Sequence, residues 1–134
     1  MISSHVLSMT LAKELKVLGV PQVSEFYWED EKLVYIDNPD DLPLSSKAIS
    51  AFLASEIEEW LPDAINTERD DGRAPENRWS CKRYRNGQLG IDHPNVKIED
   101  FWAQTMCDAL GKMLIYLIKN NLLDPSTLTR KKNL

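Results

Sequence analysis

"DALGKMLIYLIKNNLL", residues Asp108–Leu123, is the most hydrophobic stretch of the chain and decides the fold. A membrane-spanning helix needs about 20 mostly apolar residues in a row, whereas only the six residues of Met113–Ile118 stand between Lys112 and Lys119. At helical spacing the apolar side chains form one stripe: Met106, Ala109, Leu110, Met113, Leu114, Leu117 and Ile118. This spacing predicts the central core helix of a small domain.

Two further helices are expected earlier in the chain. Residues Thr10–Leu18 repeat leucine at helical spacing, and Gly19 followed by Pro21 predicts the end of that helix. Residues Ser50–Leu61 again place their apolar side chains on one face. Pro62 is expected to end this second helix, because the residue before a proline avoids the helical conformation.

Alternating side chains predict strands between the helices. Ser24–Glu29 and Leu33–Asp37 alternate in this way, and the polar pair Asp30–Glu31 between them suits a hairpin turn. A third strand is expected at Arg78–Arg85. The dipeptide Asn86–Gly87 then predicts a second hairpin, because both residues tolerate positive φ.

The remaining segments are assigned from their composition. Asn38–Ser46 and Thr67–Asn77 are polar and rich in turn-forming residues, so both are expected to be loops. Val96–Trp102 is interpreted as a strand that runs into the last helix. Thr105 is expected to cap that helix, with Asp108 three residues later as a variant of the capping box.

The predicted order is helix, hairpin, helix, hairpin, helix, which is typical of an α+β fold with about three helices packed on one small antiparallel sheet. The 134 residues have the length of a single domain. We expect that domain to cover residues 1–134, with its core at about 10–123 and flexible ends at 1–8 and 124–134. Met1–Ser8 lacks the basic start and apolar run of a signal peptide, so a cytoplasmic protein with reduced cysteines is expected.

Three segments carry a resemblance to a known group of proteins: "LAKELKVLGVPQVSEFYW" at 11–28, "ISAFLASEIEEWLP" at 49–62 and the late apolar helix. Together they resemble a family of short uncharacterised proteins carried by bacteriophages and prophages. The chain departs from that family at Leu53, where a threonine cap is more usual. It also departs at Gly111, which costs about 1 kcal/mol of helix stability relative to alanine. The resemblance implies a mobile-element origin and a single domain, and it assigns no activity.

Residues with catalytic or metal-binding chemistry are scattered along the chain. His5 and His93 are the only histidines and lie far apart in sequence, so neither a zinc site nor a catalytic triad is expected. Cys81 and Cys107 are interpreted as small buried hydrophobic residues. Three acidic clusters lack the spacing of a calcium loop and are interpreted as solvated faces. They are Asp37, Asp40 and Asp41; Glu56, Glu58 and Glu59; and Glu68, Asp70 and Asp71. We therefore assign no catalytic, cofactor-binding or metal-binding residue.

One basic stretch stands out in this acidic chain, whose net charge is −5. Residues 73–85 hold five basic residues and a single acid, Glu76. Basic residues interleaved with Trp79 and Tyr84 are typical of a nucleic-acid-binding strand. The other interpretation is that Trp79 is part of the core and that the arginines pair with acidic segments or protect a sheet edge. The candidate contact residues, for a nucleic acid or an acidic partner, are Arg78, Lys82, Arg83, Tyr84 and Arg85.

The function expected from these observations is non-catalytic protein interaction, as in a host-factor inhibitor or an assembly accessory. Four aromatic residues, Tyr27, Trp28, Trp60 and Trp102, are expected to supply surface for a protein partner or for a second copy of the chain in a homodimer. The alternative is a nucleic-acid-binding accessory protein that uses the basic hairpin 73–85. A carboxylate-based enzyme is the third interpretation. No cofactor and no membrane contact are expected.

Overall fold

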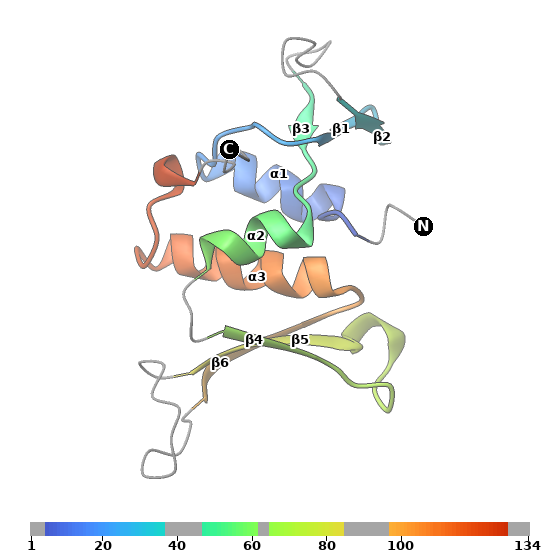
Figure 1. The fold of residues 1–134 in the computed structure, drawn as a ribbon, viewed down its shortest axis with the longest axis vertical. Coiled ribbons are helices and arrows are strands. Elements are labelled where there is room, and N and C mark those ends of the chain that lie inside the picture. The colour runs from blue at the N-terminus through green and yellow to red at the C-terminus, as the bar shows by residue number, and fades with distance from the viewer. Residues whose placement is uncertain (1–4, 37–46, 62–64, 85–96, 129–134) are drawn as a thin grey trace.

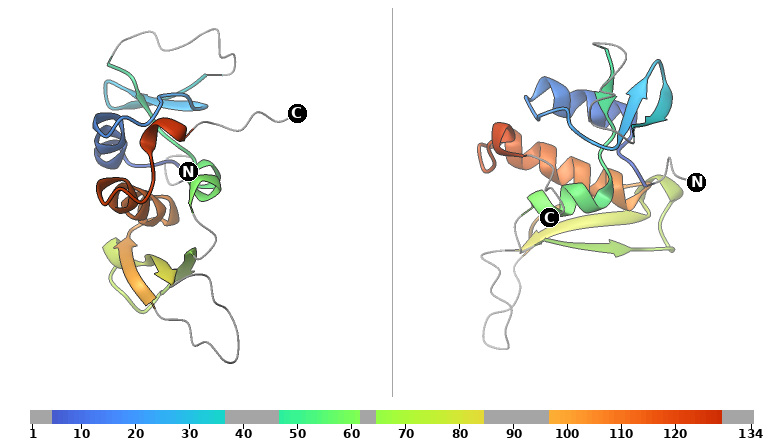
Figure 2. Two further views of the ribbon diagram at one scale, coloured as in Figure 1. Left: turned by 90° about the vertical axis from the view of Figure 1, so that its left-hand side faces the viewer. Right: turned by 45° about the horizontal axis from the view of Figure 1, so that its top comes forward.

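The computed structural model describes residues 5–36, 47–61, 65–84 and 97–128. Three helices form a layer between two small sheets (Figure 1), and the same layering is visible from two further sides in Figure 2. The elements in chain order are α1 Met9–Val17, β1 Phe26–Glu29, β2 Lys32–Tyr35, β3 Ile49–Ser50, α2 Ala54–Trp60, β4 Ile65–Arg69, η3 Pro75–Asn77, β5 Trp79–Tyr84, β6 Lys97–Ala103, α3 Met106–Lys119 and η5 Pro125–Thr127.

The α+β class is confirmed, but the predicted single sheet is wrong. Within the described residues, the strands form two separate three-stranded antiparallel sheets, in the orders β2-β1-β3 and β4-β5-β6. Two strands, β3 and β4, interrupt the predicted helix–hairpin–helix–hairpin–helix order. In the part of the chain that the structure describes, no helix is long and apolar enough to cross a membrane.

Helix α3 forms the centre of the core, as its apolar stripe predicts. It packs against all three strands of the second sheet and against α1 and α2. Its fully buried residues include Leu114, and even Ile115, which lies at the edge of the stripe, is only 6% exposed. The predicted cap is also confirmed, because the Thr105 hydroxyl accepts a hydrogen bond from the Asp108 N–H at 3.1 Å. The Asp108 carboxylate accepts from the Ser8 N–H at 2.8 Å, and so ties the start of α1 to the start of α3.

The core extends beyond the predicted limits of 10–123 at both ends. Val6 and Leu7 are buried ahead of α1, and Leu128 is buried behind η5. A Cβ atom on Gly111 would overlap Leu7 Cδ1, so the glycine allows the chain before α1 to lie directly on α3. This close approach explains why a residue that weakens an isolated helix stands in the middle of α3.

The end of α1 and the turn between β1 and β2 are determined by residues close to them in sequence. Helix α1 ends at Gly19, whose φ is +94°, and the Val20 N–H bonds to the Leu15 carbonyl at 3.1 Å, as in a Schellman motif. The predicted turn between β1 and β2 is confirmed. Asp30 and Glu31 both have positive φ, 50° and 66°, as a two-residue hairpin requires.

Two segments differ from their predicted structure. The start of the predicted helix 50–61 is strand β3, because Ile49–Ser50 pairs with β1, and the helix itself begins only after Leu53. The predicted loop Thr67–Asn77 begins with strand β4, which pairs with β5 along its whole length. Glu68 and Arg69 of this edge strand are exposed and Thr67 is half-buried, so the segment has the polar composition of a loop although it is a strand.

The second predicted hairpin is described only in part. Strand β5 falls within the predicted Arg78–Arg85, and β6, Lys97–Ala103, confirms the predicted strand that leads into α3. The predicted turn Asn86–Gly87 and the predicted loop Asn38–Ser46 lie outside the described residues.

Candidate functional site

The basic stretch 73–85 does not form one continuous basic face. Lys82 lies on the outer face of the second sheet, where its Nζ pairs with a Glu68 carboxylate oxygen at 3.2 Å. Arg83 lies on the opposite face, where its Nε and Nη2 donate to the two oxygens of Glu99 at 2.6 and 2.7 Å. Lys82 and Arg83 are therefore both engaged in ion pairs within the chain. This finding supports the interpretation that the basic residues pair with acidic segments.

The Arg83–Glu99 pair is largely shielded from solvent, with 20% and 12% of the two side chains exposed. The hydrogen bond from Arg83 holds the pKa of Glu99 below its usual value, and a further hydrogen bond from Tyr116 of α3 acts in the same direction. These contacts join β5, β6 and α3. The pair therefore belongs to the framework of the domain and is not available to a polyanion.

The other basic candidates have different surroundings. Arg73 lies over the Trp102 ring, with its guanidinium carbon 3.7 Å from the ring centroid, as a cation–π contact on the outer face of the sheet. The side chain of Tyr84 and the whole of Arg85 lie outside the described residues. Arg78 stands at the far end of the sheet from these two positions, immediately before β5.

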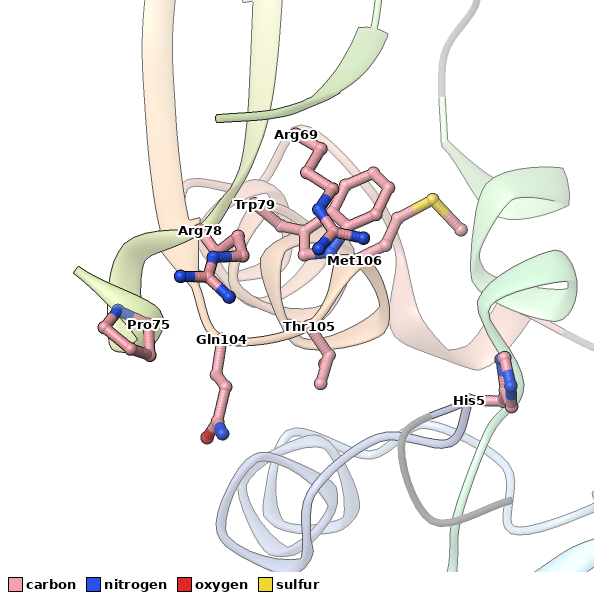
Figure 3. A pocket seen from close by; sticks show the side chains of 8 residues that line it. All are labelled: His5, Arg69, Pro75, Arg78, Trp79, Gln104, Thr105 and Met106. Atoms are coloured by element: carbon pink, nitrogen blue, oxygen red, sulfur yellow. The ribbon is translucent and has the colours of Figure 1, made fainter. Parts of the chain in front are cut away.

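Arg78 lines a cavity of about 470 Å³ at this end of the second sheet. The cavity is bounded by the connection between β4 and β5, by the junction of β6 and α3, and by the segment before α1 (Figure 3). Its lining residues are His5, Arg69, Pro75, Arg78, Trp79, Gln104, Thr105 and Met106.

The two arginines give the cavity its electrostatic character. Both guanidinium groups point into the same space in Figure 3. Arg69 Nε donates to Asp71 Oδ1 at 2.7 Å, while Arg78 Nε lies 3.9 Å from the same oxygen, beyond hydrogen-bond distance. Arg78 Nε is buried and has no hydrogen-bond partner among the described residues. The Arg78 side chain as a whole is 34% exposed, so its guanidinium can donate charge-assisted hydrogen bonds to an anion that enters the cavity.

Sequence reasoning found only part of this site. Arg78 was among the candidates, but Arg69 was assigned to a loop and His5 to a flexible end. Arg69 stands directly opposite Trp79 in the register of β4 and β5. The alternation of Ile65, Thr67 and Arg69 on one face of β4 is the signal that could have found it. Nothing local to His5 indicates that it reaches the same cavity.

The cysteines are buried, as expected. Cys81 and Cys107 are at most 1% exposed. Burial raises the pKa of the Cys81 thiol to about 12. Burial also raises the pKa of Cys107, with additional contributions from the nearby carboxylates of Asp108, Glu56 and Glu58. Both thiols therefore stay protonated at neutral pH, which is unfavourable for a nucleophile.

The carboxylates of the described acidic cluster near Gly72 interact with different partners and do not converge on one point. In the cluster near Gly72, Glu68 pairs with Lys82, Asp71 pairs with Arg69, and Asp70 accepts the Gly72 N–H at 3.0 Å. Among the described residues, no three His, Cys, Asp or Glu side chains are grouped so that they could hold a metal ion. The cluster of Asp37, Asp40 and Asp41 lies outside the described residues, as does His93.

The expected exposed aromatic residues are mostly used inside the domain. Tyr27 is 1% exposed, so its assignment to the surface is wrong. Trp28 donates its indole N–H to the Leu7 carbonyl at 2.8 Å, and Trp60 packs edge-to-face on Phe52. Each of these side chains has an intramolecular role.

The cavity of Arg69, Arg78 and Trp79 is thus the feature of the described residues with the clearest capacity to bind a ligand. It is concave, and it combines cationic, aromatic and amide side chains at one end of a rigid sheet. No family model, curated protein or solved structure matches the chain. The resemblance to short phage and prophage proteins therefore stays a prediction.

Proposed function

We propose that this protein is a non-catalytic protein-interaction module that binds an anionic segment of a partner protein in the cavity of Arg69, Arg78 and Trp79. The observation that carries the proposal is the guanidinium of Arg78, which lines a cavity large enough for a ligand and whose Nε has no hydrogen-bond partner among the described residues. About a third of this side chain is exposed, so a partner can reach it. Charge-assisted hydrogen bonds of arginine to a carboxylate are among the strongest available to a protein.

The surroundings of the cavity favour a short anionic segment over a nucleic acid. Asp71 lies close to both arginines. A nucleic acid carries many charges and extends beyond one cavity, whereas the two arginines offset by Asp71 leave about one positive charge for a ligand. Lys82 and Arg83, which the nucleic-acid alternative needs, pair with Glu68 and Glu99.

A role as a host-factor inhibitor or an assembly accessory of phage or prophage origin, acting in the cytoplasm, forms part of this proposal. Its support is the resemblance of the segments at 11–28, 49–62 and 108–123 to phage and prophage proteins. Inhibitors and assembly factors act by occupying a surface of another protein, which is what a preformed binding cavity allows.

The test is a fluorescence anisotropy titration of the full chain at low salt. The probes are labelled pools of acidic, neutral and basic peptides, and a labelled single-stranded oligonucleotide. Each peptide pool is tested in two forms, one with blocked termini and one with free termini. We expect binding of anionic peptides, and a loss of about tenfold or more in affinity for Arg78→Gln, equivalent to about 1.4 kcal/mol. Lys82→Gln is the matched control, because Lys82 lies outside the cavity, and it should bind as the native chain does.

Two outcomes would contradict the proposal. One is that no peptide pool binds at millimolar concentration. The other is that the oligonucleotide binds more tightly than any peptide and that Lys82→Gln weakens its binding, which would favour the alternative based on the hairpin 73–85.

A further inference from the structure

The cavity has a cationic wall and an apolar wall that face the same space. Arg69 and Arg78 form the first, while Trp79 and Met106 form the second (Figure 3). Asp71 pairs with Arg69, so it offsets one of the two guanidinium charges and leaves about one positive charge for a ligand. The cavity is therefore matched to a group that carries a single negative charge next to an apolar body.

We infer that the cavity receives the C-terminal residue of a partner protein, with the terminal carboxylate on Arg78 and a large apolar side chain against Trp79 and Met106. This inference rests on the proposed function and names the part of the partner that is recognised. A terminal residue carries a carboxylate and a side chain on the same Cα atom. It can therefore satisfy both walls at once, and capture of a chain end in this way is a recurring mode of peptide recognition.

An internal aspartate or glutamate fits the two walls less well. Its own side chain is the carboxylate, so the apolar group would have to come from a neighbouring residue. In an extended peptide the adjacent side chains point to the opposite side, and the next one on the same side lies roughly 7 Å away along the chain. The cavity volume of about 470 Å³ is in the lower part of the range of about 300–1,000 Å³ that is typical for small ligands. It is large enough to hold a terminal residue with an aromatic side chain.

A phosphate group fits the charge balance less well than a carboxylate. A phosphorylated side chain carries about −1.5 to −2 charges at neutral pH, whereas Asp71 leaves about one positive charge uncompensated. A planar carboxylate can instead accept two parallel N–H bonds from one guanidinium.

The experiment uses the full chain and three acetylated pentapeptides of otherwise identical sequence. The first ends in phenylalanine with a free carboxylate, the second is its C-terminal amide, and the third is an amide with an internal glutamate before the phenylalanine. Calorimetric titration should show binding of the free acid, with a loss of about tenfold or more on amidation, which corresponds to about 1.4 kcal/mol. Replacing the terminal phenylalanine by glycine should weaken binding by a similar factor, because an aromatic ring no longer leaves water.

Variants of the protein test whether the preference for a free terminal carboxylate comes from the cavity. Arg78→Gln should remove the preference for the free acid over the amide, and Arg69→Gln provides a second test should Arg78→Gln fold poorly. Arg73→Gln is the matched control, because Arg73 lies over Trp102 on the outer face of the sheet. It should keep the preference of the native chain. Thermal unfolding followed by circular dichroism verifies that each variant is folded.

The outcomes separate the inference from the proposed function. If the internal-glutamate amide binds as tightly as the free acid and Arg78→Gln weakens both, the chain-end inference is overturned and the proposed function stands. If the free acid binds equally to the native chain and to both arginine variants, the cavity is not the site and the inference is overturned. If none of the peptides binds at millimolar concentration and no other anionic peptide does, both the inference and the proposed function fail.

Discussion

Gly111 shows how a single residue can carry two opposing effects. On propensity alone, Gly111→Ala would stabilise the middle of α3 by about 1 kcal/mol. The new Cβ would, however, overlap Leu7 Cδ1, and Leu7 is fully buried and cannot turn away into solvent. Overpacking of a tight core costs about 1–3 kcal/mol. We therefore expect Gly111→Ala to lower the free energy of unfolding, as measured by denaturant titration.

A double-mutant cycle tests that explanation. Combined with Leu7→Ala, which removes the overlapping methyl groups, Gly111→Ala should no longer be destabilising, and the two changes should be non-additive by about 1 kcal/mol. A Gly111→Ala protein that is more stable than the native chain would show that Leu7 can shift at little cost, and that the glycine is not needed for the close approach.

Leu114 and Leu122 provide a matched pair of leucines in and just beyond α3. Leu114 is fully buried, whereas Leu122 is 52% exposed. Leu114→Ala should lower the free energy of unfolding by about 2–5 kcal/mol, because it removes buried methyl groups and leaves a cavity. Leu122→Ala should change it by about 0.5 kcal/mol or less. A loss under about 1 kcal/mol for Leu114→Ala in a denaturant titration would mean that α3 is not central to the core.

At the scale of elements, structure that depends on neighbouring residues was predicted correctly, and structure that depends on distant parts of the chain was not. Helix α3, the turn at Asp30–Glu31 and the Thr105 cap were predicted correctly, because each depends on side chains close together in sequence. Strands β3 and β4 were missed. Ile49–Ser50 is a strand only because β1 lies beside it, and β4 only because β5 does. The cavity was found only in part for the same reason, since only the fold brings Arg69 and His5 to the lining of the cavity that contains Arg78.

The Arg83–Glu99 pair predicts how the contact between β5 and β6 responds to pH. The pKa of Glu99 in the folded protein lies below its usual value of 4.5, chiefly because Arg83 bonds to the carboxylate. The stabilisation is therefore fully present above that value and is lost as the pH falls through the lower pKa of the folded state. Glu99→Gln should lower the melting temperature at neutral pH, and the difference from the native chain should shrink in acid.

The matched control for this pair is Glu68→Gln. Glu68 pairs with Lys82 across the outer face of the same sheet, but half of its side chain is exposed. Exposed ion pairs contribute only about 0–1 kcal/mol, so Glu68→Gln should change the melting temperature less than Glu99→Gln does. Equal shifts for the two variants, or a Glu99→Gln shift that is unchanged in acid, would contradict the assignment.

At the scale of the whole molecule, the aromatic residues no longer argue for self-association as they did in the sequence. Tyr27 is buried, and Trp28, Trp60 and Trp79 pack against the core of their own chain. Tyr35 differs from them, because it is 55% exposed and lies on β2, an edge strand of the first sheet among the described residues. An edge strand can be extended by a second copy of the same strand.

The homodimer expected from the sequence is therefore predicted to form through β2, with the two strands antiparallel about a two-fold axis, the commonest symmetry of oligomers. Light scattering at micromolar concentration should then give twice the chain mass of 15.4 kDa. Tyr35→Lys should reduce the mass to that of one chain, because a charge on the edge strand opposes pairing. Lys13→Glu, at an exposed position on α1, is the control and should leave the mass unchanged. A native chain that scatters as a single 15.4 kDa species would remove the dimer, and it would leave the cavity at Arg78 as the contact surface to test.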